Sequence, residues 1–501
     1  MRLIEIRLLE GPNLYRLEPV VKVEVASGRR RTWYGRRDPE PHALVRLAAS
    51  VPASVQPARV AILAGWVRRL RREVPDGSIG PVTVHRSSDP GHFIVVFPWA
   101  LEDRAQAIAE GSLALAGREV PPGREIGLGP GRARLRDRVL ERVRKAEGSP
   151  PGYIRDADRR VPIVSISGTN GKTTTTRLTA HILRVAGRRI GATTSDGIVV
   201  GTKMVEPGDW TGFGGGHAIL KRDDVDIAVL ETARGGILFR GLGYESNDAS
   251  VITNVSPDHL DLQGIHTLPE LAEVKSVIAL VTTPGGWVIL NADDHYVAQI
   301  ARRVRAKVAY FSLEGDRSRR IRRHLRDKGG RAYMVRDGRI GEAEGSAWRP
   351  ISALTDVPIV LGGIARHNVA NALAAAAASR AMGATIAQVR AGLKSFRPTT
   401  EDSRGRLNVF RDATRVVIID FAHNEAGVAV LLDVAEAIAK GVGGVPVTGI
   451  IGLAGDRPDD TLRGVGRIVA QRVDRFVQKE MLHYLRGRTR ESVLGEIRQG
   501  A

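Results

Sequence analysis

The residues with the clearest chemical potential are the run Gly168–Thr174 (GTNGKTT), which follows the apolar stretch Val161–Ser167. A glycine-containing turn that opens a helix presents backbone N–H groups to anions, so this run could cradle phosphates. The Lys172 ammonium would reach the β- and γ-phosphates, and the Thr173 hydroxyl would ligate Mg²⁺. Ile166 stands where the longer GxxxxGK[ST] pattern has its first glycine, so the match is to the shorter GxxGKT form. Nucleotide binding is favoured over a purely structural turn.

Acidic and imidazole side chains follow two further apolar stretches. Glu231 ends Ile227–Leu230, and a carboxylate at the end of a sheet strand downstream of a phosphate loop is placed to ligate Mg²⁺. His259, a few residues after the predicted strand Ala249–Thr253, could ligate a second cation, or Asp258 could orient that cation. Taken alone, a histidine after a strand is more often structural. A shared sheet edge with Glu231 favours the metal role.

Lys275 is notable because only 11 of the 75 basic residues (Lys and Arg) in this chain are Lys. It lies in LAEVKSVIAL (271–280), a predicted helix that is otherwise mostly apolar. One interpretation is a lysine that extends its ammonium to the surface. The other is an amine that reacts with CO₂ to give a carbamate, an anionic ligand for a second Mg²⁺ that an arginine could not form. The residues alone leave both open and favour the first.

Two regions are predicted to contain and support these side chains. Residues from Val161 to Phe396 alternate apolar strands with helices, which is typical of a parallel sheet covered on both faces. Residues 397–501 are predicted to add a βαβ unit. Its elements are the strand Val416–Ile419, the helix Ala426–Ile438 and the strand Thr448–Ile451.

The first region, 1–150, reads as a small α+β unit without a motif that indicates chemistry. GSPP (148–151) is a plausible linker to the region that follows. Its strands are expected at Leu3–Leu9, Val20–Val25 and Phe93–Phe97, and its helices at Val60–Val74, Leu101–Ala116 and Arg134–Ala146.

Composition narrows the class of protein. With 501 residues, 43% hydrophobic and 26% charged, the chain is neither a disordered tail nor a fibrous repeat. The absence of cysteine excludes disulfides and thiol chemistry. A net charge of +20 suggests anionic partners, with a general arginine bias as an equal alternative. No stretch has the length of a signal peptide core or a membrane span, so a cytoplasmic protein is expected.

The run Arg317–Lys328 (RSRRIRRHLRDK) is a basic insertion in the middle region. It contains no interleaved aromatic residues on which bases could stack. A solvated helix or loop is therefore favoured over a nucleic-acid patch.

These motifs occur in the order found in the Mur ligase superfamily, the ATP-dependent amide ligases of peptidoglycan and folylpolyglutamate synthesis, which the chain resembles from about residue 160 to 501. The resemblance rests on GTNGKTTT (168–175), Glu231, DHLD (258–261), Lys275, NADD (291–294), RHNVANALAA (366–375), GR (405–406) and DFAHNEAGV (420–428). Within that superfamily it resembles most the Mur-like part of the cyanophycin synthetases. That likeness rests on LEGPNLY (9–15), GTNGKTTTTRL (168–178), ETARGGI (231–237), GLAGDRPDD (452–460) and LRGR (485–488).

The resemblance implies an α/β protein with three domains. These are a small α+β N-terminal domain at 1–150, a central phosphate-loop domain with a parallel sheet at 160–396, and a Rossmann-like Mur ligase C-terminal domain at 397–501. The cyanophycin synthetases carry an ATP-grasp domain, which elongates the polymer backbone, between the first two. There is no room for it here, so backbone elongation is not expected. The final strand and helix of the C-terminal domain are expected to be missing or rearranged.

The resemblance also assigns roles to residues, with ATP and Mg²⁺ as cofactors. The phosphates would be bound by Gly168, Thr169, Asn170, Gly171, Lys172, Thr173 and Thr174. One Mg²⁺ would be held by Thr173 and Glu231, and a second by His259 and carbamylated Lys275. Adenosine would be lined by Asn291, His367 and Asn371, and approached from the C-terminal domain by Arg406, Asp420, His423 and Asn424. The incoming amino acid would meet Asp456 and Arg457. The catalytic group would comprise Lys172, Glu231, His259, Lys275 and Arg406.

The function implied is an ADP-forming ligase that activates a carboxylate as an acyl phosphate and joins it to an amine. The amine would be an amino acid such as Arg or Lys, and the carboxylate that of an Asp-containing acidic peptide or polymer. One alternative is a degenerate partner subunit that binds ATP without ligase activity of its own. Another, favoured by charge alone, is a nucleic-acid-dependent ATPase. No membrane or nucleic-acid partner is expected, and a homo-oligomer stays open.

Overall fold

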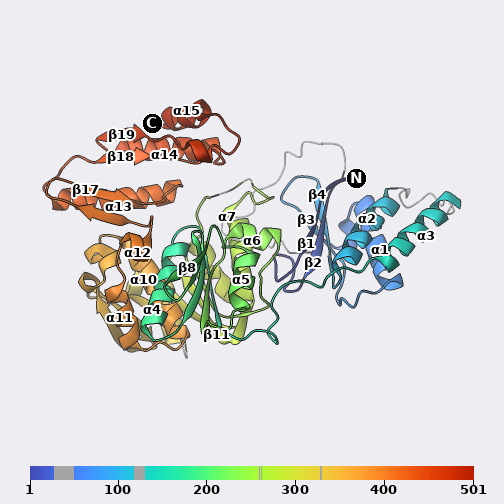
Figure 1. Cartoon of the computed structure of the whole chain (residues 1–501), viewed down its shortest axis with the longest axis horizontal. Coiled ribbons are helices and arrows are strands. Elements are labelled where there is room, and N and C mark those ends of the chain that lie inside the picture. Colours follow the sequence, from blue (N-terminus) through green and yellow to red (C-terminus); the bar gives the residue numbers. More distant parts are fainter. Residues whose placement is uncertain (28–49, 118–129, 259, 261, 328–329) are drawn as a thin grey trace.

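The computed structural model describes residues 1–27, 50–117, 130–258, 260, 262–327 and 330–501. Figure 1 shows three units, with the N-terminal unit at one end of the long axis. In this view the C-terminal unit lies above the central unit. Within the described residues, no helix is both long and apolar enough to cross a membrane.

The N-terminal unit is an antiparallel sheet with helices packed on one face (Figure 1). Alternating valines of its second strand pack on the buried side of the first helix, which gives the unit its own core. The sheet order is β1 (Arg2–Leu9), β2 (Val20–Ala26), β4 (His92–Pro98) and β3 (Thr83–Arg86). The helices are α1 (Ala58–Glu73), α2 (Glu102–Ala116) and α3 (Pro130–Lys145). The predicted small α+β unit is confirmed.

The central unit is built on an 11-stranded sheet whose order is β15-β14-β13-β12-β11-β10-β5-β9-β6-β7-β8. The strands from β13 to β6 in that order run parallel, and antiparallel hairpins extend both edges. The inner strands are β5 (Ile163–Ser167), β6 (Ile190–Thr194), β9 (Ile227–Glu231), β10 (Asn247–Ile252), β11 (Thr282–Asn291), β12 (Lys307–Ser312) and β13 (Arg331–Arg336). The edge strands are β7 (Gly197–Val200), β8 (Lys203–Pro207), β14 (Arg339–Glu344) and β15 (Ala347–Ala353).

Helices cover both faces of this sheet, as the alternation of strands and helices predicted. Successive strand residues enter different cores: Ile163 and Leu230 belong to one, Val164 and Val229 to the other. The first core is closed by α5 (Phe213–Leu220), α6 (Arg234–Phe239) and α7 (Leu268–Leu280). The second is closed by α4 (Lys172–Val185), the alanine-rich α10 (Arg366–Ala381) and α11 (Ile386–Ser395). Two shorter helices are α8 (His295–Gln299) and α9 (Arg319–Arg326).

The C-terminal unit differs from the predicted βαβ arrangement. Val416–Ile419 is indeed a strand (β17), but it pairs antiparallel with β16 (Asn408–Arg411) through a tight turn in which Asp412 N–H donates to Arg415 O. β18 (Thr448–Ile451) pairs in parallel with β19 (Arg475–Gln478) instead, across α14 (Asp459–Arg472). The predicted pairing of Val416–Ile419 with Thr448–Ile451 was wrong, because the sequence of a strand does not reveal which other strand it pairs with. This unit also contains the helices α12 (Thr400–Ser403), α13 (Glu425–Gly441) and α15 (Arg490–Gly500).

Candidate active site

The phosphate-loop run forms the turn between β5 and α4. Gly171 is the residue before α4 and has φ 86°, and Gly168 has φ 148°. A Cβ on Gly171 would lie 2.3 Å from Asn371 Oδ1, and one on Gly168 would lie 1.8 Å from Thr253 Oγ1. Both positions therefore need glycine for space as well as for conformation. The end of β10 supports the loop, since Asn254 Oδ1 accepts from Asn170 N–H at 2.9 Å.

This loop opens onto a cavity of about 640 Å³ between the central sheet and the C-terminal unit. Fourteen of the residues singled out in the sequence line it: Thr169, Asn170, Gly171, Lys172, Thr173, Thr174, Glu231, Asn291, His367, Asn371, Arg406, Asp420, His423 and Arg457. Gly168, Lys275, Asn424 and Asp456 lie outside this lining. His259 lies outside the described residues, so its predicted role stays a prediction.

Thr173 and Glu231 meet as the sequence predicted. The Thr173 hydroxyl donates to Glu231 Oε1 at 3.1 Å, and the Glu231 side chain is buried. Burial raises the pKa of Glu231, although Lys172 and Arg406 oppose the shift. Its Oε2 is buried and accepts no hydrogen bond within the described residues. A buried carboxylate oxygen without a donor fits a divalent cation, and the adjacent hydroxyl oxygen is a second suitable ligand.

The Lys172 ammonium lies over the loop that it follows. Its Nζ donates to Thr169 O at 2.9 Å, and burial lowers its pKa while Glu231 and Asp258 oppose that shift. An ammonium satisfied by one carbonyl keeps donors for an incoming anion. This placement suits a phosphate ligand in the cavity.

Lys275 is buried behind the loop, on α7. It is 4% exposed, and its Nζ donates to Gly168 O at 2.7 Å. The interpretation of a lysine that reaches the surface is therefore wrong. Burial, with the positive charges of Lys172 and Arg234 nearby, lowers the pKa of Lys275 well below its usual range. The neutral amine favoured by this shift is the form that reacts with CO₂.

Another group of residues in this lining is polar but uncharged. Asn291 Nδ2 donates to Thr253 O at 2.9 Å, and Asn371 Nδ2 donates to Asn368 Oδ1 at 3.0 Å. Burial lowers the pKa of His367 to about 4, so its imidazole is neutral at physiological pH. Phe311 contributes an apolar surface to the same lining. Amides, a neutral imidazole and an aromatic ring suit a nucleoside better than a phosphate.

The C-terminal unit adds cations and amides across the cavity. Arg406 Nη2 donates to Thr173 Oγ1 at 3.3 Å, and its guanidinium lies 5.4 Å from the Phe421 ring centroid. The next residue, Leu407, is buried with φ 50°, a strained backbone conformation for a leucine. Its N–H donates to Asp420 Oδ2 at 2.7 Å. Asp420 thus fixes the turn that presents Arg406, and burial raises its pKa.

Two further contacts join the C-terminal unit to the central one. The side chains of Asn424 and Asn170 exchange hydrogen bonds of 3.1 and 3.3 Å. Arg457 Nη1 donates to Asp258 Oδ1 at 2.7 Å. Asp456, predicted beside Arg457 as a substrate residue, keeps 41% of its side chain exposed. The structure therefore brings Arg457, but not Asp456, to the cavity.

The sequence analysis missed Asp209, Ser195 and Asp294, which also line the cavity. Asp209 follows β8, and its charge acts on both Lys172 and Glu231. Ser195 Oγ lies 3.5 Å from Thr173 Oγ1. No motif surrounds Asp209 or Ser195, so only their position could reveal them. Asp294 belongs to the NADD run, and its place after a predicted strand was an available signal.

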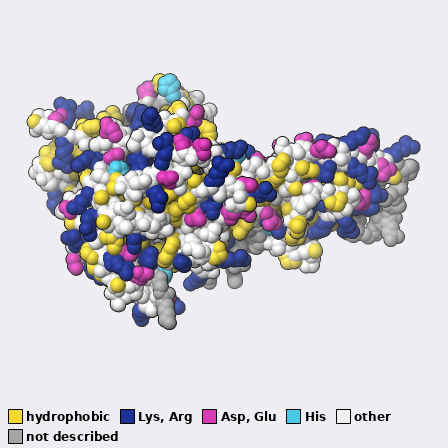
Figure 2. All heavy atoms as spheres, turned by 60° about the horizontal axis from the view of Figure 1, so that its bottom comes forward, with side chains coloured by type: hydrophobic (Ala, Val, Ile, Leu, Met, Phe, Trp, Pro, Cys, Tyr) yellow, Lys and Arg dark blue, Asp and Glu magenta, His cyan; other side chains and the backbone are white. Residues whose placement is uncertain are grey.

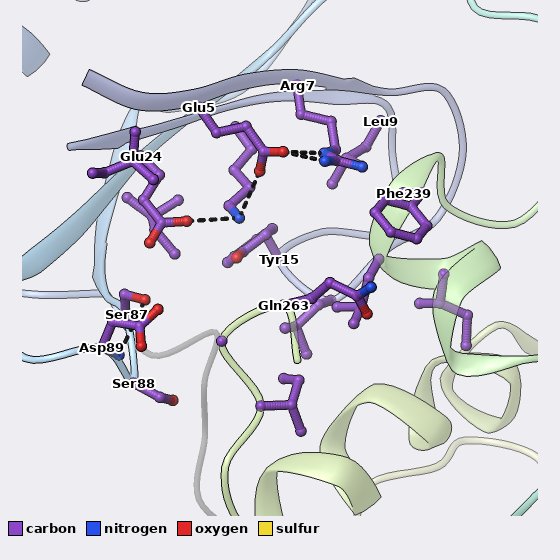
Figure 3. A pocket seen from close by; sticks show the side chains of 18 of the residues that line it. Glu5, Arg7, Leu9, Tyr15, Glu24, Ser87, Ser88, Asp89, Phe239 and Gln263 are labelled. Atoms are coloured by element: carbon purple, nitrogen blue, oxygen red, sulfur yellow. Dashed lines mark hydrogen bonds and ion pairs between the residues drawn. The ribbon is translucent and has the colours of Figure 1, made fainter. Parts of the chain in front are cut away.

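A second cavity, of about 380 Å³, lies between the N-terminal sheet and the central unit (Figure 3). Lys22 Nζ bridges Glu5 at 3.1 Å and Glu24 at 2.8 Å, as the dashed lines in Figure 3 show. Desolvation raises the pKa of Tyr15 in the same pocket to about 12. Both carboxylates are already paired with a cation, so their charges do not define a ligand.

Parts of this chain are similar in sequence to known proteins. Residues 166–379 match the Mur ligase middle domain. The chain is 40% identical to cyanophycin synthetase of Trichormus variabilis over 341 residues, which are 68% of this chain and 37% of that protein. It is 33% identical to UDP-N-acetylmuramoylalanine–D-glutamate ligase of Symbiobacterium thermophilum over 238 residues, 47% of this chain and 45% of that one.

One solved structure that aligns with this chain is the ligand-free bifunctional folylpolyglutamate synthase/dihydrofolate synthase from Yersinia pestis. It aligns with a TM-score of 0.48 at 17% identity, over 67% of this chain and 79% of that one. The match to the cyanophycin synthetase of Trichormus variabilis covers 37% of that protein, so this chain spans well under half of its length.

Proposed function

Because residues 166–379 are a Mur ligase middle domain, we propose that this chain is an ATP-dependent, ADP-forming amide ligase. The observation that carries the proposal is the meeting of Lys172, Thr173 and Glu231 in one cavity, with the second Glu231 oxygen buried and without a donor. Phosphoryl transfer requires a phosphate-binding loop beside a carboxylate that can ligate Mg²⁺.

The residues present fit MgATP. Thr173 and Glu231 would hold one Mg²⁺. Lys275, if carbamylated, would supply an anionic oxygen toward a second, together with His259. When bound, Mg²⁺ supplies positive charge against the phosphate oxygens. The loop N–H groups and Lys172 would bind the phosphates, and Asn291, His367 and Asn371 would line the nucleoside.

The proposed reaction has two steps. In the first, a substrate carboxylate oxygen attacks the γ-phosphorus of ATP, the bond to the β,γ-bridging oxygen breaks, and ADP leaves with that electron pair. In the second, an amine nitrogen attacks the acyl phosphate carbon, phosphate leaves and the nitrogen loses a proton. Lys172 of the central unit and Arg406 of the C-terminal unit line the same cavity, and Arg406 donates to the Thr173 hydroxyl. Both cations can therefore offset the negative charge that accumulates when the substrate carboxylate approaches the ATP phosphates.

The contacts from the C-terminal unit support exclusion of water during this reaction. Arg406, Asn424 and Arg457 all donate hydrogen bonds to residues of the central unit. An acyl phosphate is hydrolysed when water reaches it, so a covered site favours the amine.

For substrates, we propose an Asp-containing acidic peptide or polymer as the carboxylate and a basic amino acid, Arg or Lys, as the amine. The support is the 40% identity to a cyanophycin synthetase and the net charge of +20, which attracts a polyanionic acceptor.

The test is a screen of the twenty amino acids against short Asp-containing peptides with MgATP. ADP is assayed enzymatically and products are read by mass spectrometry. We expect ADP release that depends on both substrates and a product heavier by one amino acid residue. Lys172→Ala is the matched inactive control, since it removes the ammonium at the phosphates. ADP release without any amide product in all combinations would contradict the proposal.

A second candidate is an ATP-binding partner subunit without ligase activity of its own. The specific observation in its favour is that Arg457, expected to meet the amino acid, is engaged by Asp258. This alternative predicts MgATP binding by calorimetry but no turnover with any substrate pair. A rise in phosphate release on addition of DNA or RNA would instead favour a nucleic-acid-dependent ATPase.

A further inference from the structure

We propose that helix α9 is a docking site for an extended polycarboxylate chain, the acidic acceptor of the ligase reaction, beside the nucleotide cavity. The proposal rests on the proposed function for the identity of the acceptor. Its structural basis is a group of guanidinium side chains, called here the α9 arginines: Arg319, Arg320, Arg322, Arg323 and Arg326.

Within the described residues, no carboxylate lies within 4.0 Å of an α9 arginine, whereas some arginines elsewhere in the chain pair with two carboxylates. Arg472, for example, pairs with Asp433 and Glu436, and Arg349 with Glu342 and Glu344. The helix α9 itself contains no acidic residue. Like charges three and four residues apart destabilise a helix by about 0.2–0.5 kcal/mol per pair. A bound polyanion would remove that repulsion.

The helix is nevertheless held firmly with its charges outward. Ile321 is fully buried, and the His324 ring meets Tyr310 edge-on at 4.8 Å between centroids. Arg322 Nη1 donates to the carbonyls of Asp316 and Arg317 at 2.6 and 2.8 Å. Because the helix is packed, its backbone loses little entropy when a ligand binds.

Three guanidinium groups remain available to a ligand. Arg319, Arg323 and Arg326 are exposed, and the one hydrogen bond recorded among their side chains runs from Arg326 Nε to Arg322 O at 3.3 Å. Along a helix, residues four apart rise by about 6 Å. Along an extended peptide, side chains on one face repeat about every 6.8 Å. The two spacings are close enough for successive same-face Asp side chains of an acceptor to meet Arg319 and Arg323.

The surface also lies next to the reaction cavity. Arg320 Nη1 donates to the carbonyl of Ala292, the residue that follows Asn291 at the end of β11. Asn291 and Asp294, on either side of Ala292 and Asp293, both line the cavity. A polymer bound on α9 therefore lies close to Asn291, one of the cavity residues proposed to line the nucleoside.

A polycarboxylate is favoured over a nucleic acid because the surroundings offer no platform for bases. Of the nearby aromatic side chains among the described residues, Tyr310 and Phe311 are buried. The Trp287 and Trp348 rings are covered by the guanidinium groups of Arg331 and Arg336, each 4.5 Å from the ring centroid. Binding of single strands relies on stacking as well as charge.

The test measures binding of a fluorescein-labelled poly-L-aspartate of about twenty residues by anisotropy, without nucleotide, at several salt concentrations. The variant is R319Q/R323Q/R326Q. The control, R134Q/R138Q/R144Q, removes the same charge from exposed positions of α3. We expect the α9 variant to weaken binding about tenfold at low salt with a shallower salt dependence, and the control to stay within twofold. Equal losses in both variants, or no binding by the wild type, would overturn the proposal.

Two further measurements separate this proposal from the proposed ligase. In steady-state assays, the α9 variant should raise KM for a long acidic acceptor about tenfold, and leave kcat and the KM for an Asp dipeptide acceptor unchanged. Poly-aspartate binding that depends on α9 in a protein without turnover would refute the ligase and retain the docking site. If an oligonucleotide of equal charge competes more strongly than poly-aspartate and depends on α9, the partner is a nucleic acid and the proposal is wrong.

Discussion

Arg457 of the C-terminal unit and Asp258 of the central unit form an ion pair at 2.7 Å, with 10% and 12% of their side chains exposed. The pair joins two units at the edge of the cavity that also holds the phosphate loop. An ion pair so little hydrated has a large effect when one partner is lost, because the other keeps its desolvation cost. We therefore expect this pair to hold the C-terminal unit in place over the cavity.

The first prediction concerns that contact. Arg457→Ala should lower the rate of amide formation about a hundredfold or more, because a misplaced closing element impairs orientation. The affinity for MgATP, measured by calorimetry, should change less than threefold. Arg490→Ala, which breaks an exposed pair with Glu480, is the control and should leave both values unchanged. Unchanged amide formation in Arg457→Ala would show that closure does not need this pair.

The second prediction concerns the cation ligands. Glu231→Gln keeps the shape of the side chain but removes its charge, so the Mg²⁺ concentration for half-maximal activity should rise about ten- to a hundredfold. The measurement is a Mg²⁺ titration of activity at fixed ATP. Combining Glu231→Gln with Thr173→Val should give less than the sum of the single effects, since both side chains address one ion. Additive effects would argue that Thr173 and Glu231 do not bind the same Mg²⁺ ion.

The third prediction concerns the phosphate loop. Lys172→Ala should lower kcat about a thousandfold, because a positioned cation at the transferring phosphoryl group is lost. Folding should be retained because, within the described residues, the hydrogen bond of the Lys172 ammonium goes to a single acceptor, the Thr169 carbonyl. Lys145→Ala, at an exposed position of α3, is the matched control. Wild-type turnover in Lys172→Ala would exclude the loop as the phosphate site.

The fourth prediction tests the carbamate at Lys275. Lys275→Arg should be nearly inactive, because a guanidinium keeps the charge but cannot form the carbamate. Lys275→Ala should regain part of its activity when formate or acetate is added, since a small carboxylate can take the place of the carbamate oxygens. Thermal unfolding of both variants establishes that they fold. A fully active Lys275→Arg variant would remove this model of the second metal site.

The fifth prediction concerns pH and His367, whose pKa burial lowers to about 4. An unfolded histidine titrates at about 6.5, so the half-buried, neutral His367 contributes full stability above that value. The contribution is lost as the pH falls from about 6.5 toward 4, and linkage gives about 2 kcal/mol lost by pH 5. Urea unfolding of His367→Gln should therefore show a smaller loss between pH 7.5 and 5 than the wild type.

The control for this measurement is His483→Gln, because His483 is exposed. It should follow the wild-type pH dependence. If His367→Gln and the wild type lose the same free energy of unfolding, His367 is not buried in its neutral form in solution.

Much of the candidate site could be predicted from sequence because its residues lie where strands end. GTNGKTT after β5, Glu231 at the end of β9 and Asn291 at the end of β11 are each local patterns. In a parallel sheet the carboxyl ends of the strands share one edge, so such patterns converge without further information. The same reasoning failed for β17 and β18, because hydrogen-bonded pairing is a relation between distant segments.

By itself, the sequence determined the identity of the phosphate loop, the α/β alternation and the residue types at the strand ends, since periodicity and turn chemistry are local properties. Only the tertiary structure decided that Lys275 is buried behind Gly168, that Arg457 meets Asp258, and that Arg319, Arg323 and Arg326 of α9 are exposed. Burial and charge pairing depend on which segments pack together, and those distances are set by the whole fold rather than by neighbours along the chain.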